Sequence, residues 1–280
     1  MKSSHVLPLS LVSLLTIAQS VHAGPFVTPG VPADGPFAGW ATDVIDASFT
    51  SSGSAAAAAG NALGAPDGTL VSLGDLTAAQ INEGAAVGQI TLGFGSQFLR
   101  NGPGWDLAVF ENAGTFFEPP FIFGELAYVE VSSNGVDFAR FPATSLNVEP
   151  GEGDADTELI DTFGRSFAGL NATNVHNLVG VHPQGIGTPL DLAELAAHPL
   201  IGAGLLDLSR ISAVRLVDIP GSGDFLDDAG RGILDAWPTA GTGGLDLDSL
   251  GGRYLVPEPT GSGPLLILLL ASLWRRWKAK

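Results

Sequence analysis

The sequence predicts an all-β fold, an antiparallel β-sandwich of jelly-roll type with one short helix, and three observations support this. The 280 residues include 38 Gly and 19 Pro, scattered between short apolar runs, which is typical of many turns joining many strands. Several of these runs alternate apolar and polar residues, the period of a strand. One segment alone has convincing signals for the start of a helix.

The clearest strand signal is a hairpin in the middle of the chain. Residues 126–132 and 136–141 carry β-branched and aromatic side chains, and Ser133-Asn134-Gly135 between them supplies the residues of a tight turn. Further strands are expected over residues 89–94, 106–110, 211–219 and 245–256. Turn residues separate each of these runs from the next.

The predicted helix covers residues 189–197. Thr188 suits the N-cap, Pro189 the first helical position and Asp191 the first turn. Two other segments are expected to be loops. One is residues 48–59, which end in five alanines, and the other is the acidic stretch 150–161.

The N-terminus has the pattern of a signal peptide over residues 1–23. Lys2 precedes an apolar segment, and Val21-His22-Ala23 is a small-x-small cleavage site, so cleavage is expected between Ala23 and Gly24. The chain is therefore predicted to be exported. Residues 24–47 are then a Pro- and Gly-rich extended lead-in, and residues 48–255 form the β-sandwich ectodomain.

The C-terminal residues 256–280 predict a membrane anchor. Val256-Pro257-Glu258-Pro259 is followed by an apolar run and then by Arg275, Arg276, Lys278 and Lys280. A helix over residues 257–274 would be about 27 Å long, enough to cross a bilayer. The basic residues beyond this transmembrane helix should stay in the cytoplasm.

This order of Pro-Glu-Pro, apolar segment and basic end resembles the PEP-CTERM sorting signal of exported bacterial proteins. The resemblance implies that an exosortase, a membrane protease, cuts near Val256, Pro257, Glu258 and Pro259 and releases or transfers the protein to the cell surface. The alternative is an ordinary anchor that is never cut. Either reading places the protein in the cell envelope or on the surface.

The hairpin also resembles that of discoidin-type and other galactose-binding-like jelly rolls. Four segments, one of them within the hairpin, are similar to a group of PEP-CTERM surface proteins, namely residues 65–68 (Ala-Pro-Asp-Gly), 106–112, 132–135 and 243–248. The resemblance implies a galactose-binding-like fold and a surface location. It implies no reaction.

The charge of the ectodomain restricts its partners. Five of the 12 Lys and Arg and one of the 29 acids lie in the two terminal signals, which leaves 28 acids against seven Arg, a net charge of −21. Such a surface repels nucleic acid and attracts cations. The sequence has no Cys, so thiol catalysis and Cys-based metal sites are excluded.

Calcium is the cofactor that the acids suggest. Asp246 and Asp248 alternate with Leu245 and Leu247 and would face one side of a strand. Galactose-binding-like jelly rolls often hold a structural calcium between an N-terminal loop and the last strand, and Asp67, Asp246 and Asp248 match that arrangement. The alternative is a set of solvated turn acids. The acids of residues 224–235 do not have the spacing of an EF-hand.

Aromatic residues suggest carbohydrate binding. Trp105, Phe116 and Phe117 are the candidate ligand-binding residues, the last two in a Pro-rich loop. The alternative for that loop is packing over an open end of the sandwich. The expected function is a non-catalytic surface protein that binds extracellular polysaccharide or has a structural role in the envelope or matrix.

A secreted polysaccharide hydrolase is the alternative function. It requires two carboxylates across a cleft, and Glu111 and Glu130 are candidates because they fall in strands expected to be adjacent. The sequence has no Gly-x-Ser-x-Gly elbow and no His-Glu-x-x-His motif, so serine hydrolase and zinc protease chemistry have no support.

Overall fold

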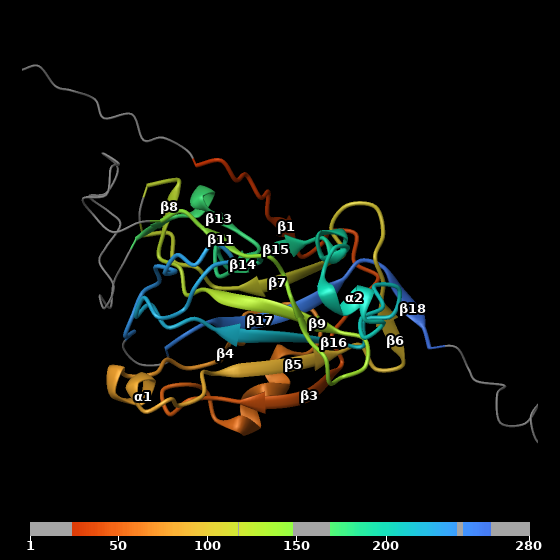
Figure 1. Ribbon diagram of the computed structural model, residues 1–280, viewed down its shortest axis with the longest axis horizontal. Coiled ribbons are helices and arrows are strands. Elements are labelled where there is room, and N and C mark those ends of the chain that lie inside the picture. Colours follow the sequence, from red (N-terminus) through yellow and green to blue (C-terminus); the bar gives the residue numbers. More distant parts are fainter. Residues whose placement is uncertain (1–23, 117, 148–168, 240–242, 259–280) are drawn as a thin grey trace, which may run out of the picture.

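Two six-stranded antiparallel sheets make up most of the fold (Figure 1). The computed structural model describes residues 24–116, 118–147, 169–239 and 243–258. Strands and connecting loops dominate this part of the chain and its helices are short, so the predicted all-β fold is confirmed, and the facing sheets are consistent with a β-sandwich. The signal peptide, the acidic loop 150–161 and the apolar run of the C-terminus lie outside the described residues.

The first sheet contains the longest strand, β17, beside β7. Its order is β1 (Val31–Pro32), β15 (Ile186–Leu190), β7 (Leu107–Glu111), β17 (Asp246–Gly252) and β2 (Gly39–Trp40), with β4 (Val71–Ser72) also paired to β17. The last predicted strand, residues 245–256, is thus interrupted, because the chain turns after Gly252 before β18 (Leu255–Pro257) begins.

The second sheet contains the predicted hairpin. Its order is β10 (Ala139–Arg140), β9 (Ala127–Ser132), β16 (Ala213–Asp218), β5 (Gln89–Gly93) and β3 (Asp43–Ser48), with β14 (Leu178–Val179) also paired to β9. The strands expected near residues 89–94, 106–110, 126–141 and 211–219 are confirmed. The connection between β9 and β10 is longer than a two-residue turn, and the side chain of Asn134 accepts hydrogen bonds from Val136 and Asp137 within it.

Short elements complete the fold. Three two-stranded pairs are β11 (Thr144–Ser145) with β13 (Val175–His176), β12 (Leu170–Asn171) with β8 (Phe121–Ile122), and β18 (Leu255–Pro257) with β6 (Gln97–Leu99). The helices are η1 (Ala56–Ala62), η2 (Ala172–Asn174) and η3 (Leu192–Leu195), which are 3-10 turns, and α1 (Ala78–Asn82) and α2 (Pro199–Gly202). Among the described residues no helix is long and apolar enough to cross a membrane.

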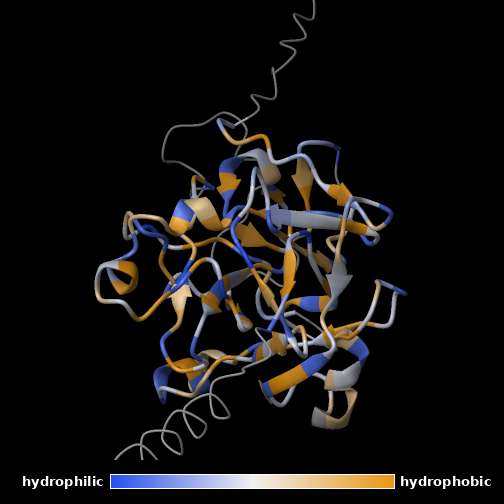
Figure 2. Ribbon diagram, turned by 90° about the vertical axis from the view of Figure 1, so that its right-hand side faces the viewer, coloured by the Kyte–Doolittle hydropathy of each residue, from blue (hydrophilic) through white to orange (hydrophobic). Residues whose placement is uncertain are grey.

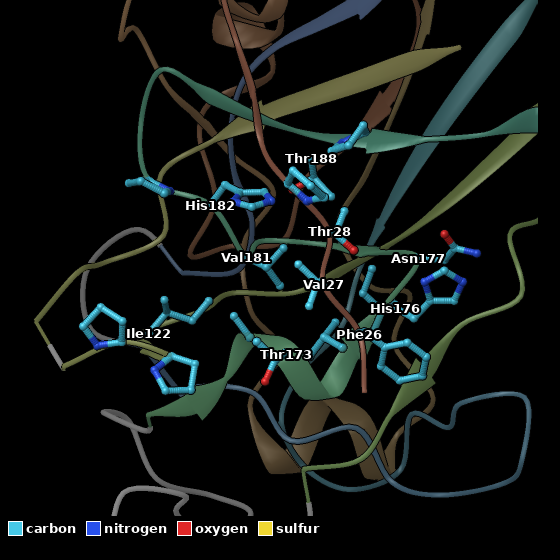
Figure 3. Close-up of a pocket in the computed structure, with 18 of the residues that line it drawn as sticks. Phe26, Val27, Thr28, Ile122, Thr173, His176, Asn177, Val181, His182 and Thr188 are labelled. Carbon is cyan, nitrogen blue, oxygen red and sulfur yellow. The ribbon is translucent and has the colours of Figure 1, made fainter. Parts of the chain in front are cut away.

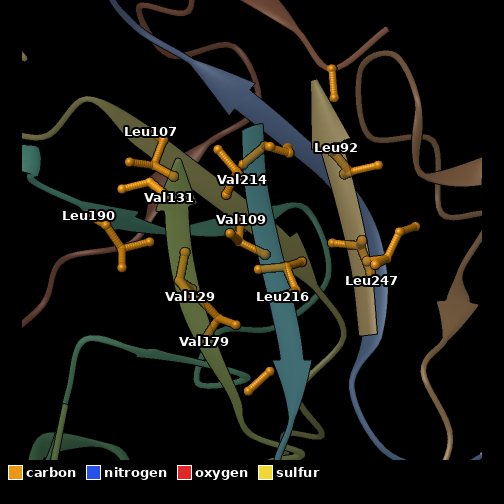
Figure 4. Close-up of a cluster of buried hydrophobic side chains, with 14 of the residues drawn as sticks. Leu92, Leu107, Val109, Val129, Val131, Val179, Leu190, Val214, Leu216 and Leu247 are labelled. Atoms are coloured by element: carbon orange, nitrogen blue, oxygen red, sulfur yellow. The ribbon is translucent and has the colours of Figure 1, made fainter. Parts of the chain in front are cut away.

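The core lies between the two sheets. Leu107 and Val109 of β7 face Val129 and Val131 of β9, and Leu216 of β16 packs with them (Figure 4). All five side chains are fully buried, and burial of apolar area contributes roughly 25 cal/mol per Å² to stability. Figure 2 shows the apolar segments gathered in the central strands and polar ones in many of the surrounding loops.

The first sheet is buried on its outer face as well. Phe110 points away from the core, and its ring lies 5.6 Å from that of Phe37 and 5.4 Å from that of Trp40. Both partners belong to the Pro- and Gly-rich lead-in, whose strands β1, β2 and β3 pair with β15, β17 and β5. The predicted lead-in therefore forms part of the sandwich.

The predicted helix over residues 189–197 is only partly right, because only Leu192–Leu195 form a helical turn, η3. Thr188 and Pro189 lie in β15, where they pair with Val109 and Ala108 of β7. Pro189 is tolerated because β1 pairs with β15 only at residues 186–187, which leaves the outer side of β15 unpaired at residue 189. The helical turns begin later. Asp191 caps η3 through Ala193, and His198 caps α2, which has Pro199 at its first position.

The loop expected over residues 48–59 is only partly right. The alanine run continues into the 3-10 helix η1 over Ala56–Ala62, because Ala59 and Ala62 are buried against the core. Alanine suits this position since it has a strong helix propensity and a small side chain. The apolar face of η1 thus consists of the methyl groups of Ala59 and Ala62, which is too small to be recognised as a helical pattern in the sequence.

Candidate ligand pocket

A pocket of about 480 Å³ opens at the side of the first sheet. Its walls come from the N-terminal segment 26–29, the loop before β8, the β12–β14 region and the end of β15. Figure 3 shows Phe26, Val27 and Thr28 running through the site, with His182 and Ile122 on one side and His176 and Asn177 on the other. Most of the lining side chains are apolar or aromatic.

Two local features shape the floor of the pocket. Asn171 pairs with Phe121 across β12 and β8, and its side chain accepts a hydrogen bond from Thr173 at the start of η2. Asn177 has a φ of 55°, a left-handed conformation that Asn tolerates better than most residues, and it makes the chain turn between β13 and β14. The side chain of His176 therefore faces the pocket beside Asn177.

The N-terminal segment is held on this floor by backbone and ring contacts. The backbone N–H of Phe26 donates to the carbonyl oxygen of Thr173 at 3.0 Å, and that of Gly24 donates to Thr173 Oγ1. The ring of Phe26 stacks on His176 with centroids 5.1 Å apart and planes 14° apart. Val27, in contrast, is 78 % exposed.

His182 and Thr188 provide two buried polar atoms without a protein partner in the described chain, His182 Nε2 and Thr188 Oγ1. Burial lowers the pKa of His182, and a hydrogen bond with the backbone of Thr28 opposes that shift. The ring is therefore neutral at pH 7. The hydrogen bond with Thr28 favours the protonated ring, so the ring nitrogen in that bond carries a hydrogen and donates it. In the neutral ring the other nitrogen, Nε2, is therefore an acceptor.

A charged network lies at the other side of the pocket. Glu194 Oε2 is 3.0 Å from His176 Nε2 and accepts a hydrogen bond from Asn177 Nδ2 at 2.5 Å. The hydrogen bond with His176 is the main cause that lowers the pKa of Glu194, so this carboxylate is ionised at neutral pH. Asp191 adds a second acid to the lining.

Of the three aromatic residues expected to bind ligand, one lines this pocket. Trp105 lies at its edge, and its ring is 5.3 Å from that of Phe37 and 4.8 Å from the guanidinium of Arg253. Phe116 is 72 % exposed and contacts Phe123 edge-on at 6.2 Å. Phe117 lies outside the described residues. Phe26, His176 and His182 carried no ligand-binding signal, because only the fold brings their segments together.

Of the three residues expected to bind calcium, Asp67 and Asp248 lie together and Asp246 lies apart. Asp248 is buried, and its carboxylate accepts hydrogen bonds from the backbone N–H groups of Asp67 and Gly68 at 3.1–3.2 Å. Asp67 Oδ1 instead accepts from Thr69. Asp246 lies elsewhere, because a β-bulge between Leu247 and Ser249 inserts Asp248 as an extra residue.

These three residues fit a cation poorly. Donors surround the Asp248 carboxylate, and the described residues contain no group of three His, Asp or Glu arranged to hold a metal ion. The expectation that Asp246 and Asp248 face one side of a regular strand fails at the bulge. Calcium binding by Asp67, Asp246 and Asp248 stays a prediction.

The two carboxylates of the hydrolase alternative are not adjacent. Glu111 ends β7 in the first sheet, whereas Glu130 lies in β9 of the second sheet. Glu130 forms ion pairs with Arg140 at 2.9 Å and Arg215 at 2.5 Å, and Glu111 accepts the backbone N–H of His182 at 2.7 Å. The expected adjacency of their strands is wrong.

The residues of the expected sorting motif begin inside the fold. Val256 and Pro257 lie in β18, paired with Phe98 and Gln97 of β6, and Glu258 is exposed. Pro259 and Ala23 lie outside the described residues. Comparison with known proteins gives no identification, because no protein family model and no curated protein matches the sequence.

Proposed function

We propose that the chain is an exported, surface-sorted, non-catalytic β-sandwich protein whose pocket binds a glycan. The proposal is carried by one observation, the two buried polar atoms without a protein partner on the pocket wall, His182 Nε2 and Thr188 Oγ1. More than nine in ten buried polar groups in proteins have a hydrogen-bond partner. A pair of exceptions in one pocket wall points to a ligand that completes them. Because both atoms are closed to solvent in the free protein, this ligand must displace the groups that cover them.

A hydroxyl group suits these two atoms. The neutral His182 ring offers an acceptor at Nε2, and the Thr188 hydroxyl can donate or accept. A sugar hydroxyl both donates and accepts hydrogen bonds. One hydroxyl can therefore bond either His182 Nε2 or Thr188 Oγ1, and two neighbouring hydroxyls can bond both atoms. An anion would not satisfy the acceptor nitrogen, and an apolar ligand would leave both atoms unpartnered.

The other walls suit the remaining parts of a sugar ring. Aromatic faces such as those of Phe26 and Trp105 can pack against C–H groups, while the ionised Glu194 accepts hydrogen bonds from hydroxyls. The strongly acidic chain disfavours polyanionic polysaccharides. The proposed ligand is therefore a neutral glycan.

The proposed fold and address follow from the same features of the chain. The two facing antiparallel sheets support a jelly-roll, galactose-binding-like sandwich. The exposed Pro257 and Glu258 at the end of β18 support access of an exosortase-type protease to the motif. In this proposal the protein resides in the cell envelope or on the surface.

The two carboxylates suggested for a hydrolase, Glu111 and Glu130, do not form a catalytic pair. Retaining and inverting glycosidases need two carboxyl groups within about 5–9.5 Å of each other across a cleft. Glu130 is in the opposite sheet from Glu111 and is neutralised by two arginines. We therefore propose binding and not turnover.

The test is a glycan array with the purified full-length protein, followed by affinity measurements on the variant Thr188→Val. This change removes the hydroxyl and keeps the shape of the side chain. The expected loss is about tenfold to hundredfold in affinity, the effect of about 1–3 kcal/mol for an unpaired polar partner. Thr115→Val is the matched control, because Thr115 lines the same pocket but is exposed at its rim.

The unfolding temperature provides the second measurement. If the Thr188 hydroxyl has no partner in the free protein, Thr188→Val should leave the unfolding temperature unchanged or raise it. Binding to no glycan, or equal glycan affinity of Thr188→Val and the unaltered protein, contradicts the proposal. Release of new reducing ends during incubation with a bound glycan would favour the hydrolase instead.

A further inference from the structure

Five acids converge at one end of the sandwich, where strands of both sheets begin or end. Asp218 is the last residue of β16, and Asp246 is the first of β17. Asp75 follows β4, Glu125 precedes β9, and Asp235 accepts the backbone N–H of Leu126 at 2.7 Å. Figure 1 shows β7 and β16 ending at the same side of the molecule. We call these five residues the acidic cluster.

The members of the acidic cluster act on one another. Burial is the main cause that raises the pKa of Glu125, Asp218 and Asp235. Neighbouring charges raise each pKa further: Asp246, Asp75 and Asp218 act on Glu125, Asp75 and Asp246 on Asp218, and Asp218, Asp75 and Glu125 on Asp235. Asp75, Asp218 and Asp235 are also buried. Like charges so close together and so poorly hydrated destabilise the fold unless something neutralises them.

No basic side chain of the described residues does so. The described chain has no Lys, and its six Arg are occupied elsewhere. Arg140 and Arg215 pair with Glu130, and Arg231 pairs with Asp227. The guanidinium groups of Arg100, Arg210 and Arg253 lie over the rings of Tyr254, Phe98 and Trp105.

Asp218 gives a second, independent observation. Its Oδ1 accepts the backbone N–H of Leu245 at 2.8 Å, but its Oδ2 is buried and has no hydrogen-bond donor. The whole residue is 0 % exposed. A buried carboxylate oxygen without a donor, among four other acids, needs a positive partner, either a proton or a cation. Hard divalent cations supply that partner, since they prefer carboxylate and carbonyl oxygens.

We propose that the acidic cluster binds one calcium ion, with Asp218 as its central ligand. As the side chains lie, no three His, Asp or Glu of the described chain are arranged to hold a metal ion. Binding therefore requires carboxylates to turn toward Asp218 Oδ2. Glu125 and Asp246 can do this, because they are the two partly exposed members.

The consequence is a clamp between the two sheets. Asp246 belongs to the first sheet and Asp218 to the second, so an ion shared between them joins β17 to β16. Because the unfolded chain does not form this arrangement, the ion stabilises the folded state by mass action. The expected rise in unfolding temperature is several degrees for a chain of this size. The inference does not depend on the glycan proposal.

The experiment is calorimetric titration of the EDTA-treated full-length protein with calcium chloride, and unfolding with and without calcium. One ion per chain and a higher unfolding temperature are expected. Terbium, a luminescent substitute, should be sensitised through Trp237, whose indole N–H bonds the carbonyl oxygen of Leu76 beside Asp75. Trp237→Phe should reduce that signal.

The variant Asp218→Asn tests whether calcium binds at the acidic cluster or only responds to the overall negative charge of the protein. Oδ1 of Asn can still accept from Leu245, so the variant should fold, unfold at a higher temperature than the unaltered protein in EDTA, and lose at least tenfold in calcium affinity. The matched control is Asp67→Asn with Asp248→Asn, the pair at the other acidic site, which should bind calcium normally. Absence of heat with millimolar calcium overturns the proposal. So does loss of binding in the control alone, which would place the ion at Asp67 and Asp248.

Discussion

Both carboxylate oxygens of Asp248 lie within 3.2 Å of the backbone nitrogen of Gly68. The two residues are 180 positions apart, so this contact ties the longest strand to a loop near the N-terminus. Asp248 reaches the loop because it is the extra residue of the bulge between Leu247 and Ser249. A bulge redirects its side chain away from the regular alternation of the strand.

We expect Asp248→Ala to lower the free energy of unfolding by about 1–3 kcal/mol. The change leaves the N–H groups of Asp67 and Gly68 without their charged acceptor, and a hydrogen bond to a charged group contributes about that much. Denaturant titration of the calcium-free protein measures it. Asp67→Asn is the control, because Asn can still accept from Thr69 in that exposed turn. Equal stability of Asp248→Ala and the unaltered protein would show that the contact contributes nothing.

Glu130 should contribute to stability and not to function. It is 8 % exposed and accepts hydrogen bonds from Arg140 Nε at 3.0 Å and Arg215 Nε at 2.7 Å. Glu130→Gln leaves two guanidinium groups without their counter-ion. Because both arginines are partly exposed and therefore screened, we expect a loss of about 2 kcal/mol and not more.

Denaturant titration at low and high salt measures the Glu130→Gln effect, and the exposed Asp228→Asn serves as control. The loss should shrink as salt rises. Unchanged glycan binding is expected in the variant. A loss of glycan binding without a change in stability would contradict the structural role of Glu130.

The local β signals predicted the strands well, because alternation and turn residues act within a few positions. Tertiary pairing decided the rest. Thr188 and Pro189 have the residue types of a helix start, yet pairing of β15 with β7, about 80 residues earlier, keeps them extended. Propensity is a weak prior that such pairing overrides. The bulge at Asp248 is likewise invisible in a run that alternates perfectly.

The pocket was harder to predict than the fold. It joins Phe26 to His176 and His182 through contacts between segments about 150 residues apart, and no spacing along the chain encodes that meeting. Trp105 was a candidate because aromatic residues can stack on carbohydrate, and it lines the pocket. The acidic surplus was visible in composition, but which acids converge depends on where strands of both sheets end.

Glycan binding should weaken as the pH falls below the ordinary histidine pKa of 6.5. Burial lowers the pKa of His182, so its Nε2 remains an acceptor at neutral pH and is lost only at lower pH. The free energy of unfolding should also fall as the pH falls, because His182 binds its proton at a higher pH in the unfolded chain than in the folded one. Affinity measured from pH 8 to pH 4.5 should be flat and then fall.

Three other ionisable side chains line that pocket, His176, Asp191 and Glu194. A His176→Asn variant removes the only other histidine among the lining residues in the described chain, so it should keep the acid loss of binding. A His182→Phe variant should bind weakly at every pH and show no such fall. If the loss of binding at low pH disappears in His176→Asn, the effect belongs to His176 and the assignment to His182 is wrong.

Sorting predicts a shortened C-terminus. In a host with an exosortase, the mature protein should lack about 20 residues from its C-terminus, since cleavage is expected near Pro257, Glu258 and Pro259. Mass spectrometry of the surface fraction measures this. Replacement of Pro257 and Pro259 by Ala should leave the tail in place. An intact Arg275–Lys280 tail on most surface copies of the unaltered protein would instead indicate a plain anchor.

Gly180 is the position where a single methyl group should damage the fold most. A Cβ there would lie 2.1 Å from the carbonyl oxygen of Glu125, and the residue has a φ of 100°. The contact is with backbone, which has little room to move. Gly180→Ala should therefore cost about 3 kcal/mol or more, from the clash together with the left-handed backbone.

Gly185→Ala separates these two causes. Gly185 has a φ of 83°, but a Cβ there would meet nothing within 4 Å. It should cost about 1 kcal/mol, the effect of the left-handed conformation without the clash. Since Gly180 packs on Glu125, a member of the acidic cluster, Gly180→Ala should also weaken calcium binding in whatever fraction remains folded. Equal stability of the two variants, measured by denaturant titration, would show that the chain relaxes around residue 180 and that the close approach is not required.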